Sequence, residues 1–182
     1  MTDHRRAGAP EHTIVVGVDG SELSRQAVLW AADEAELRHA TLDVVHGGSG
    51  DLPHLGTPRS TDVPPTTAGA VVDEAIRLAT SRRPDIVVRG ETSDRPAARA
   101  LIDTSEGTDL LVVGARGKGG FSGLLLGSVS HRCIQYARCP VVVVRPTAPD
   151  DDVAAADRTI IVGIDGSAGS DLALRWTMGE AA

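Results

Sequence analysis

Residues 109–130 contain the residue types and the spacing that could bind an anion. An apolar run from Leu110 to Gly114 leads into a glycine-rich loop, and the loop ends at Gly127 and Ser128, where a helix could begin. Glycines let backbone N–H groups approach an anion without a Cβ in the way, and a helix N-terminus adds free N–H donors and about half a positive charge. This order of strand, glycine loop and helix start predicts a phosphate pocket.

A second candidate group follows the first apolar run, in the sequence Gly17-Val18-Asp19-Gly20-Ser21. Open parallel sheets bind ligands at the carboxyl ends of their strands, so Asp19 would lie at the mouth of such a site. Its carboxylate could accept a hydrogen bond from a ribose, or hold a divalent cation that bridges to phosphate. The alternative is that Asp19 and Ser21 only cap the helix that follows.

Two well-known phosphate signatures are absent from these segments. There is no Gly-x-x-x-x-Gly-Lys-Ser/Thr motif, and no Gly-x-Gly-x-x-Gly follows the first apolar run. The spacing that remains is Gly114-x2-Gly117-x9-Gly127-Ser128. Arg116 and Lys118 add positive charge within the loop, and the amides of Val129 and Ser130 would complete an anion site at the helix start. The alternative interpretation is a tight turn that packs the helix against the sheet.

Hydrophobic periodicity predicts the elements that must position these groups. Short apolar runs predict five strands, at Thr13–Val18, Thr41–His46, Asp85–Arg89, Asp109–Gly114 and Val141–Arg145. Helical patterns between them predict four helices, at Ser21–Arg38, Ala68–Arg82, Arg95–Ser105 and Ser128–Ala137. Strict alternation of strand and helix is typical of an α/β fold with an open parallel sheet.

Composition limits the classes of function. The chain has 182 residues, of which 41% are hydrophobic and 24% charged, as in a globular protein of one domain and a little more. The net charge of −7 argues against nucleic-acid binding by bulk electrostatics. Met1 to His12 do not resemble a signal peptide, and no segment approaches the ~20 apolar residues that span a bilayer. We therefore expect no nucleic-acid or membrane partner and a cytoplasmic location.

Other reactive side chains form no catalytic pattern that can be read from their spacing. Cys133 and Cys139 are predicted to be small buried residues rather than a disulfide or a zinc site. His46 ends a predicted strand near the candidate site, where it could contact a ligand or simply terminate the strand. His131 is predicted on a helix surface. We expect no catalytic residues, because no Ser/His/Asp or Cys/His arrangement is evident.

The chain repeats its own beginning. Thr13–Ser21 returns as Thr159–Ser167, and Trp30 returns as Trp176 at the same offset. We predict a disordered N-terminus at 1–12, a domain at 13–146, a linker at 147–158, and the first strand and helix of a second copy at 159–182. The Gly- and Pro-rich segment 47–67 is predicted to be a mobile loop.

The motif Gly114-x2-Gly117-x9-Gly127-Ser128, together with Val-Gly-Val-Asp-Gly-Ser at residues 16–21, resembles the universal stress protein family. The resemblance covers about residues 13–146. It implies a Rossmann-like five-stranded sheet in the order 3-2-1-4-5 with helices on both faces, and dimers that pair through the last strand. This motif marks the branch of the family that binds ATP, here expected with Mg²⁺. Tandem members carry two such domains, so the partial repeat resembles a tandem chain truncated early in its second domain.

Carried over residue by residue, the resemblance implies that Asp19 meets the ribose or phosphates and that the Val45 backbone meets the adenine. Asp19 is also the candidate Mg²⁺ ligand. The full expected cofactor-binding set is Val18, Asp19, Ser21, Val45, Gly114, Arg116, Gly117, Gly127, Ser128, Val129 and Ser130. Because the second copy has no glycine loop of its own, we expect one nucleotide per chain.

Three functions remain open. The leading interpretation is an ATP-binding regulatory protein of the stress response, with slow ATP hydrolysis at most. The alternatives are a nucleotide-independent dimeric interaction module and an enzyme that adenylates a substrate. We also expect a homodimer through Val141–Arg145, because an exposed strand of four valines is a template for pairing.

Overall fold

The structure of this chain is a computed structural model, and it describes residues 12–48, 67–117, 125–146 and 160–180. The chain divides into two compact units, Met1–Pro146 and Thr147–Ala182. The segment 1–11 of the predicted disordered N-terminus, residues 49–66 of the predicted mobile loop and the 147–158 linker lie outside the described residues.

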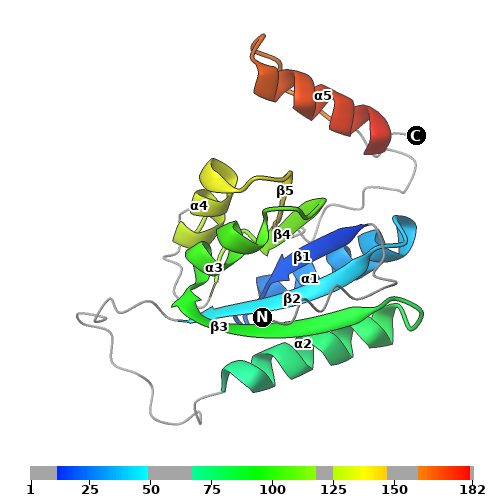
Figure 1. The fold of residues 1–182 in the computed structure, drawn as a ribbon, viewed down its shortest axis with the longest axis vertical. Helices are drawn as coiled ribbons and strands as arrows, with labels where there is room; N and C mark the ends of the chain where they lie inside the picture. Colours follow the sequence, from blue (N-terminus) through cyan, green and yellow to red (C-terminus); the bar gives the residue numbers. More distant parts are fainter. Residues whose placement is uncertain (1–11, 49–66, 118–124, 147–159, 181–182) are drawn as a thin grey trace, which may run out of the picture. The chain divides into compact units, whose positions relative to one another are not determined.

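The first unit is a five-stranded sheet with helices between the strands (Figure 1). Its elements are β1 (Thr13–Gly17), α1 (Glu22–Leu37), β2 (Thr41–Gly48), α2 (Ala68–Arg82), β3 (Val88–Pro96), α3 (Ala97–Thr104), β4 (Leu110–Gly114), α4 (Ser128–Tyr136) and β5 (Val141–Val144). The strand order is β3-β2-β1-β4-β5 and every pairing is parallel. The predicted fold class and strand order are therefore confirmed.

The helices cover the sheet on both faces. Helices α1 and α2 pack against one face and against each other, while α3 and α4 do the same on the other. The central strands β1 and β4 are buried along most of their length. With 2% aromatic residues in the chain, valine, leucine, isoleucine and alanine make up this core. Such a core holds the carboxyl ends of β1 and β4 in a rigid frame.

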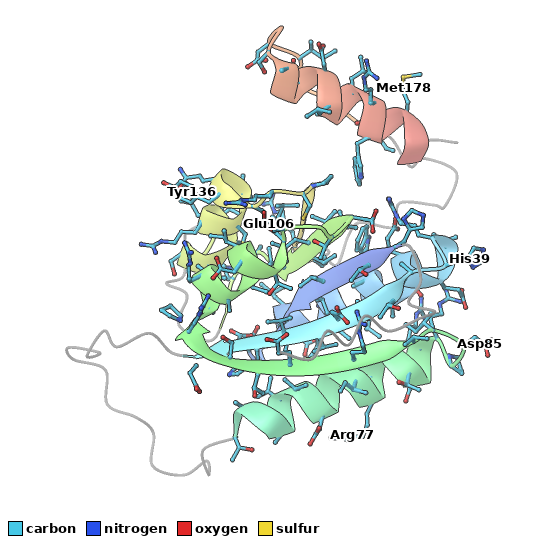
Figure 2. The ribbon with its side chains drawn as sticks, viewed as in Figure 1. His39, Arg77, Asp85, Glu106, Tyr136 and Met178 are labelled. Atoms are coloured by element: carbon cyan, nitrogen blue, oxygen red, sulfur yellow. The ribbon has the colours of Figure 1, made fainter. Side chains whose placement is uncertain are left out.

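The start of helix α1, next to the carboxyl end of β1, is fixed by local sequence. Gly20 has φ +75°, a conformation that side chains rarely adopt, and it turns the chain out of β1. The Ser21 hydroxyl then caps the helix by accepting the Ser24 N–H at 3.2 Å. At the other end, His39 (φ +52°, labelled in Figure 2) reverses the chain into β2.

The third strand and third helix differ from the sequence prediction. The strand was expected at Asp85–Arg89 but spans Val88–Pro96, and the helix begins at Ala97 rather than Arg95. The apolar run that signalled the strand lies mostly ahead of it. Because β3 is an edge strand with a largely exposed surface, it needs no apolar run of its own, and periodicity therefore misplaces it.

The second unit repeats the turn that starts α1. The Asp165 carboxylate accepts the Ser167 N–H at 2.9 Å, and the Ser167 hydroxyl accepts the Ser170 N–H at 3.2 Å. The corresponding bonds before α1 have the same lengths. Helix α5 (Ala168–Glu180) follows, whereas residues 160–165 form no strand. The local part of the repeat thus forms although the described residues of this unit include no strand.

Both cysteines are free thiols. Cys133 belongs to the buried core cluster, and Cys139 packs against that cluster. Burial, together with the neighbouring Cys139, raises the pKa of the Cys133 thiol to about 11. A thiol with that pKa is protonated at neutral pH, so Cys133 serves as a small apolar residue.

Among the helices that the structure describes, none has the length and apolar character that crossing a membrane requires.

Candidate functional site

The predicted site residues gather at the carboxyl ends of β1 and β4. These two strands are neighbours in the sheet although β2 and β3 lie between them in the chain. The chain runs to one side of the sheet after β1 and to the other side after β4, so the first turns of α1 and α4 diverge at this point. Crevices of this kind are where open α/β sheets bind ligands.

The turn after β1 is held by the Asp19 side chain. Its Oδ1 accepts the Ser21 N–H at 2.9 Å, while Ser21 caps α1. The capping interpretation is therefore correct for the Ser21 hydroxyl, whereas Oδ1 holds the turn that precedes the helix. The other carboxylate oxygen of Asp19, Oδ2, faces the loop after β4.

Gly117, in the loop after β4, lies directly against Asp19. A Cβ built on Gly117 would overlap Asp19 Oδ2. Gly117 is exposed and Asp19 is half-buried, so this contact lies at the surface of the crevice. The two motifs that the sequence singled out are thus joined in space, and the second glycine of the motif makes room for the aspartate.

Position 114 requires a glycine because of a different contact. A Cβ there would lie 2.9 Å from the backbone carbon of Leu23 and 3.0 Å from its carbonyl oxygen. The first turn of α1 packs directly on this glycine. Gly114 therefore permits close packing of α1 against β4, which then brings Asp19 toward the glycine loop.

The glycine loop is closed at its base by one backbone carbonyl. The Ala115 oxygen accepts the Gly127 N–H at 2.7 Å and the Ser130 hydroxyl at 2.9 Å. Sequence reasoning missed Ala115, and no side-chain signal could have revealed it, because it acts through its backbone. The closure explains why the spacing matters, since Gly127 must return to the end of β4 whatever the intervening residues do.

The closure also changes what Ser130 can offer a ligand. Ser130 is 2% exposed, and its hydroxyl lies between the carbonyl oxygens of Ala115 and Gly127. The hydroxyl is directed into the protein, so only the backbone amide of Ser130 remains for the anion site that the sequence predicted.

Helix α4 begins at this closed base. Gly127 is the N-cap residue and brings no side chain, so no described side chain caps the helix. The first-turn amides of Ser128, Val129 and Ser130 have no acceptor within the helix. Ser128 is exposed, and Val129 packs its side chain against the core cluster. The arrangement can bind an anion at its helix N-terminus.

The backbone of Arg116 lies close to the start of α4. A Cβ built on Gly127 would lie 3.4 Å from the Arg116 Cα, which is ordinary contact. The Arg116 side chain is half-buried. Lys118, the other predicted cation, lies outside the described residues.

Near the end of β2, the side chains expected at the site are buried, so this strand can offer a ligand mainly backbone atoms. Val45 is 2% exposed and Val18 is 7% exposed. The Val45 carbonyl accepts the Val18 N–H at 2.9 Å, so part of the backbone expected to meet adenine is already used by the sheet. His46 lies beside this pair, with Nδ1 2.7 Å from the Val18 carbonyl oxygen.

The described residues include no group of three or more His, Cys, Asp or Glu side chains that could hold a metal. A divalent ion at Asp19 would therefore need its other ligands from a bound phosphate and from water, which is common for Mg²⁺.

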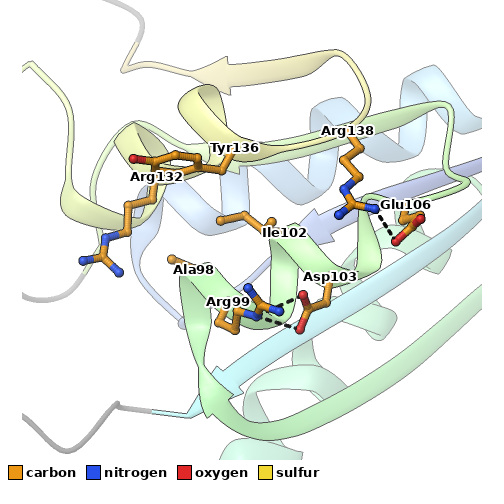
Figure 3. A pocket seen from close by; sticks show the side chains of 8 residues that line it. All are labelled: Ala98, Arg99, Ile102, Asp103, Glu106, Arg132, Tyr136 and Arg138. Carbon is orange, nitrogen blue, oxygen red and sulfur yellow. Dashed lines mark hydrogen bonds and ion pairs between the residues drawn. The ribbon is translucent and has the colours of Figure 1, made fainter.

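A separate hollow lies between α3 and α4 (Figure 3). It measures about 350 Å³, and ion pairs Arg99–Asp103 and Arg138–Glu106 lie along it. These charges satisfy one another, and no predicted site residue lines the hollow. The candidate site is defined by the backbone amides and Asp19 instead.

Comparisons with known proteins agree on one family. The model of the universal stress protein family matches residues 11–145. Universal stress protein Rv2623 of Mycobacterium tuberculosis is 34% identical over 180 residues, which cover 92% of this chain and 59% of that protein. The chain thus spans less than two thirds of the length of this curated relative.

Two similar solved structures, each at least 25% identical to this chain, are described as complexes with a nucleotide. A universal stress protein in complex with cAMP is 29% identical with a TM-score of 0.54, covering 73% of this chain and 95% of that one. The universal stress protein of Archaeoglobus fulgidus in complex with dAMP is 25% identical with a TM-score of 0.54, covering 73% and 97%.

Proposed function

The chain belongs to the universal stress protein family, and from that premise we propose that it binds an adenine nucleotide, ATP with Mg²⁺, as a regulatory protein of the stress response. The observation that carries the proposal is the closure at Ala115, which holds the α4 N-terminus, capped by no described side chain, at the end of β4, where Gly117 lies against Asp19. The two similar structures described with cAMP and dAMP support an adenine nucleotide as the ligand.

The residues present fit such a ligand. The amides of Ser128, Val129 and Ser130 would donate to the phosphates, and Arg116 would supply positive charge beside them. Asp19 Oδ2 would accept from a ribose hydroxyl or coordinate Mg²⁺, while Oδ1 keeps its bond to the Ser21 N–H. A phosphate-bound Mg²⁺ would neutralise charge between the nucleotide and Asp19. The proposal assigns binding and orientation to these side chains and no catalytic residue.

ATP rather than a nucleoside monophosphate is the finer part of the proposal. It rests on the motif Gly114-x2-Gly117-x9-Gly127-Ser128, which resembles that of the ATP-binding branch of the family. Location in the cytoplasm stays a prediction.

We extend the proposal to a homodimer through Val141–Arg145. All four valines of β5 are half-buried, and within the described residues β5 pairs with β4 alone. An edge of this composition is a natural surface for a second copy of the chain. A tandem arrangement in a longer protein would place a second domain against the same edge.

Calorimetric titration with ATP, with and without Mg²⁺, tests the proposal in the wild type and in Gly127→Glu. A carboxylate at the α4 N-terminus repels phosphate, so heat of binding is expected in the wild type and not in the variant. Gly69→Glu is the matched control, since it places the same charge in the first turn of α2 at a position with open space around it. The proposal fails if the wild type gives no heat with ATP, or if Gly127→Glu binds like Gly69→Glu.

A further inference from the structure

The backbone ladder between β1 and β2 ends at one place. The last backbone hydrogen bond that the described residues show between these segments runs from the Val18 N–H to the Val45 carbonyl, at 2.9 Å. In a regular parallel ladder, the Gly47 N–H would next donate to the Val18 carbonyl. The Val18 oxygen instead lies 2.7 Å from Nδ1 of His46.

This contact identifies Nδ1 as the ring nitrogen of His46 that donates to Val18. A carbonyl oxygen can only accept a hydrogen bond, so Nδ1 must carry the hydrogen that it donates. The imidazole thereby takes the position of a ladder amide. The chain after Val18 is released from β2 at this residue and enters the Asp19 turn.

We propose that His46 is a positioning residue of the candidate nucleotide site: its Nδ1–H holds the Val18 carbonyl and thereby sets where the Asp19 carboxylate lies. The inference rests on the proposed function for its effect on nucleotide affinity. Asp19 directly follows Val18 and has little room for error, because its Oδ2 lies against Gly117. Rotation of the Val18 peptide would move that carboxylate out of the crevice.

Replacing His46 by Asn and by Gln distinguishes the hydrogen-bonding role of its ring from a role in packing alone. In Asn the amide nitrogen is bonded to Cγ, as Nδ1 is in His, so His46→Asn keeps a donor within reach of Val18. In Gln the nitrogen lies one bond further out, so His46→Gln loses it. His46→Phe keeps the ring and removes the donor. His39→Asn is the control, since His39 is an exposed turn residue remote from the crevice.

Affinity for Mg²⁺-ATP is the first measurement. His46→Phe and His46→Gln are expected to weaken binding about tenfold, as for the loss of one well-placed hydrogen bond, and His46→Asn to stay within about twofold of the wild type. In an Asp19→Ala background, His46→Phe should weaken binding less than about twofold, because its effect passes through Asp19. Additive losses, or equal affinities of the Asn and Gln variants, overturn the proposal.

Backbone amide chemical shifts without nucleotide are the second measurement. His46→Phe and His46→Gln should shift the amides of Asp19, Gly20 and Ser21, and His46→Asn should leave them near their wild-type positions. If the wild type binds no nucleotide but these shifts appear, the proposed function fails and the positioning role stands. Unmoved amides in the Phe and Gln variants overturn the positioning role whatever the nucleotide result. If His46→Phe does not fold, the Asn and Gln pair decides alone.

Discussion

Asp19 and Gly117 touch across the crevice between β1 and β4, although 98 positions separate them (117 − 19). Asp19 Oδ1 holds the turn into α1 by accepting the Ser21 N–H, and Oδ2 lies where a Cβ of residue 117 would be. The contact couples the first strand to the glycine loop. Its consequence is that a methyl group at position 117 would change the proposed nucleotide site through the aspartate.

Gly117→Ala is expected to weaken Mg²⁺-ATP binding about tenfold or more while changing stability little. The new methyl group displaces a flexible carboxylate rather than backbone, so the fold can adjust at small cost. Calorimetry measures the first effect and urea unfolding the second. Gly69→Ala, in open space on α2, should leave nucleotide affinity unchanged. Wild-type affinity in Gly117→Ala would contradict the role of the contact.

Asp19→Asn separates a metal ligand from a ribose contact. The Asn side-chain oxygen can still accept the Ser21 N–H, so the turn and the helix cap are retained. If Asp19 coordinates Mg²⁺, the variant should lose more affinity for Mg²⁺-ATP than for metal-free ATP. Equal losses for the two ligands would indicate a ribose contact instead. Titrations with and without EDTA give the comparison.

Val143→Pro is expected to abolish a dimer and leave the protomer folded. The carbonyls of Pro140 and Val144 accept hydrogen bonds from β4, so the even residues of β5 face β4 and the N–H of Val143 faces away from β4. Proline there removes one donor from the edge and none from the ladder. Val142→Pro, the matched control, removes a ladder donor and should destabilise the fold. Sedimentation at tens of micromolar measures the mass, and a wild-type monomer or a dimeric Val143→Pro refutes the interface.

Asp33→Asn is expected to make stability depend less on pH. Asp33 accepts hydrogen bonds from Arg82 and Arg83, which join α1 to the end of α2. The hydrogen bond from Arg82 is the main cause that lowers the pKa of the Asp33 carboxyl from its ordinary value of 3.8, against the opposing effect of burial.

A lowered folded-state pKa stabilises the protein above the unfolded value and ceases to do so as the pH falls through the folded value. The variant should therefore be about 1 kcal/mol less stable than the wild type at pH 7. That difference should shrink as the pH falls below 3.8. Urea unfolding across this range measures it. Glu22→Gln is the control, because its carboxylate is 76% exposed and lies 3.9 Å from Arg25. A difference independent of pH would contradict the assignment.

The buried strands could be predicted from the sequence, and the exposed one could not. In β1 and β4 every fully buried residue is apolar because both faces are covered, and that requirement is visible as an uninterrupted run. At the edge of the sheet, β3 meets solvent along most of its length and is free to be polar. Its bounds depend on pairing with β2, which no local pattern encodes.

The candidate site likewise has features that the sequence predicts and features that it does not. Glycines and capping residues depend on local backbone geometry, so the spacing Gly114-x2-Gly117-x9-Gly127-Ser128 and the turn before α1 were evident in the sequence. The second copy of that turn, at Asp165, supports this reasoning, because it forms the same hydrogen bonds although the described residues of its unit include no strand.

The sequence by itself therefore determined the fold class, the strand order through its family resemblance, and the residue types that could hold a phosphate. The tertiary structure alone decided which of their atoms are available. It turns the Ser130 hydroxyl inward to Ala115, sets Asp19 against Gly117, and gives the Val18 carbonyl to His46. These are contacts between segments far apart in the chain. They exist because the buried sheet brings the ends of β1, β2 and β4 together, and periodicity within one segment carries no information about them.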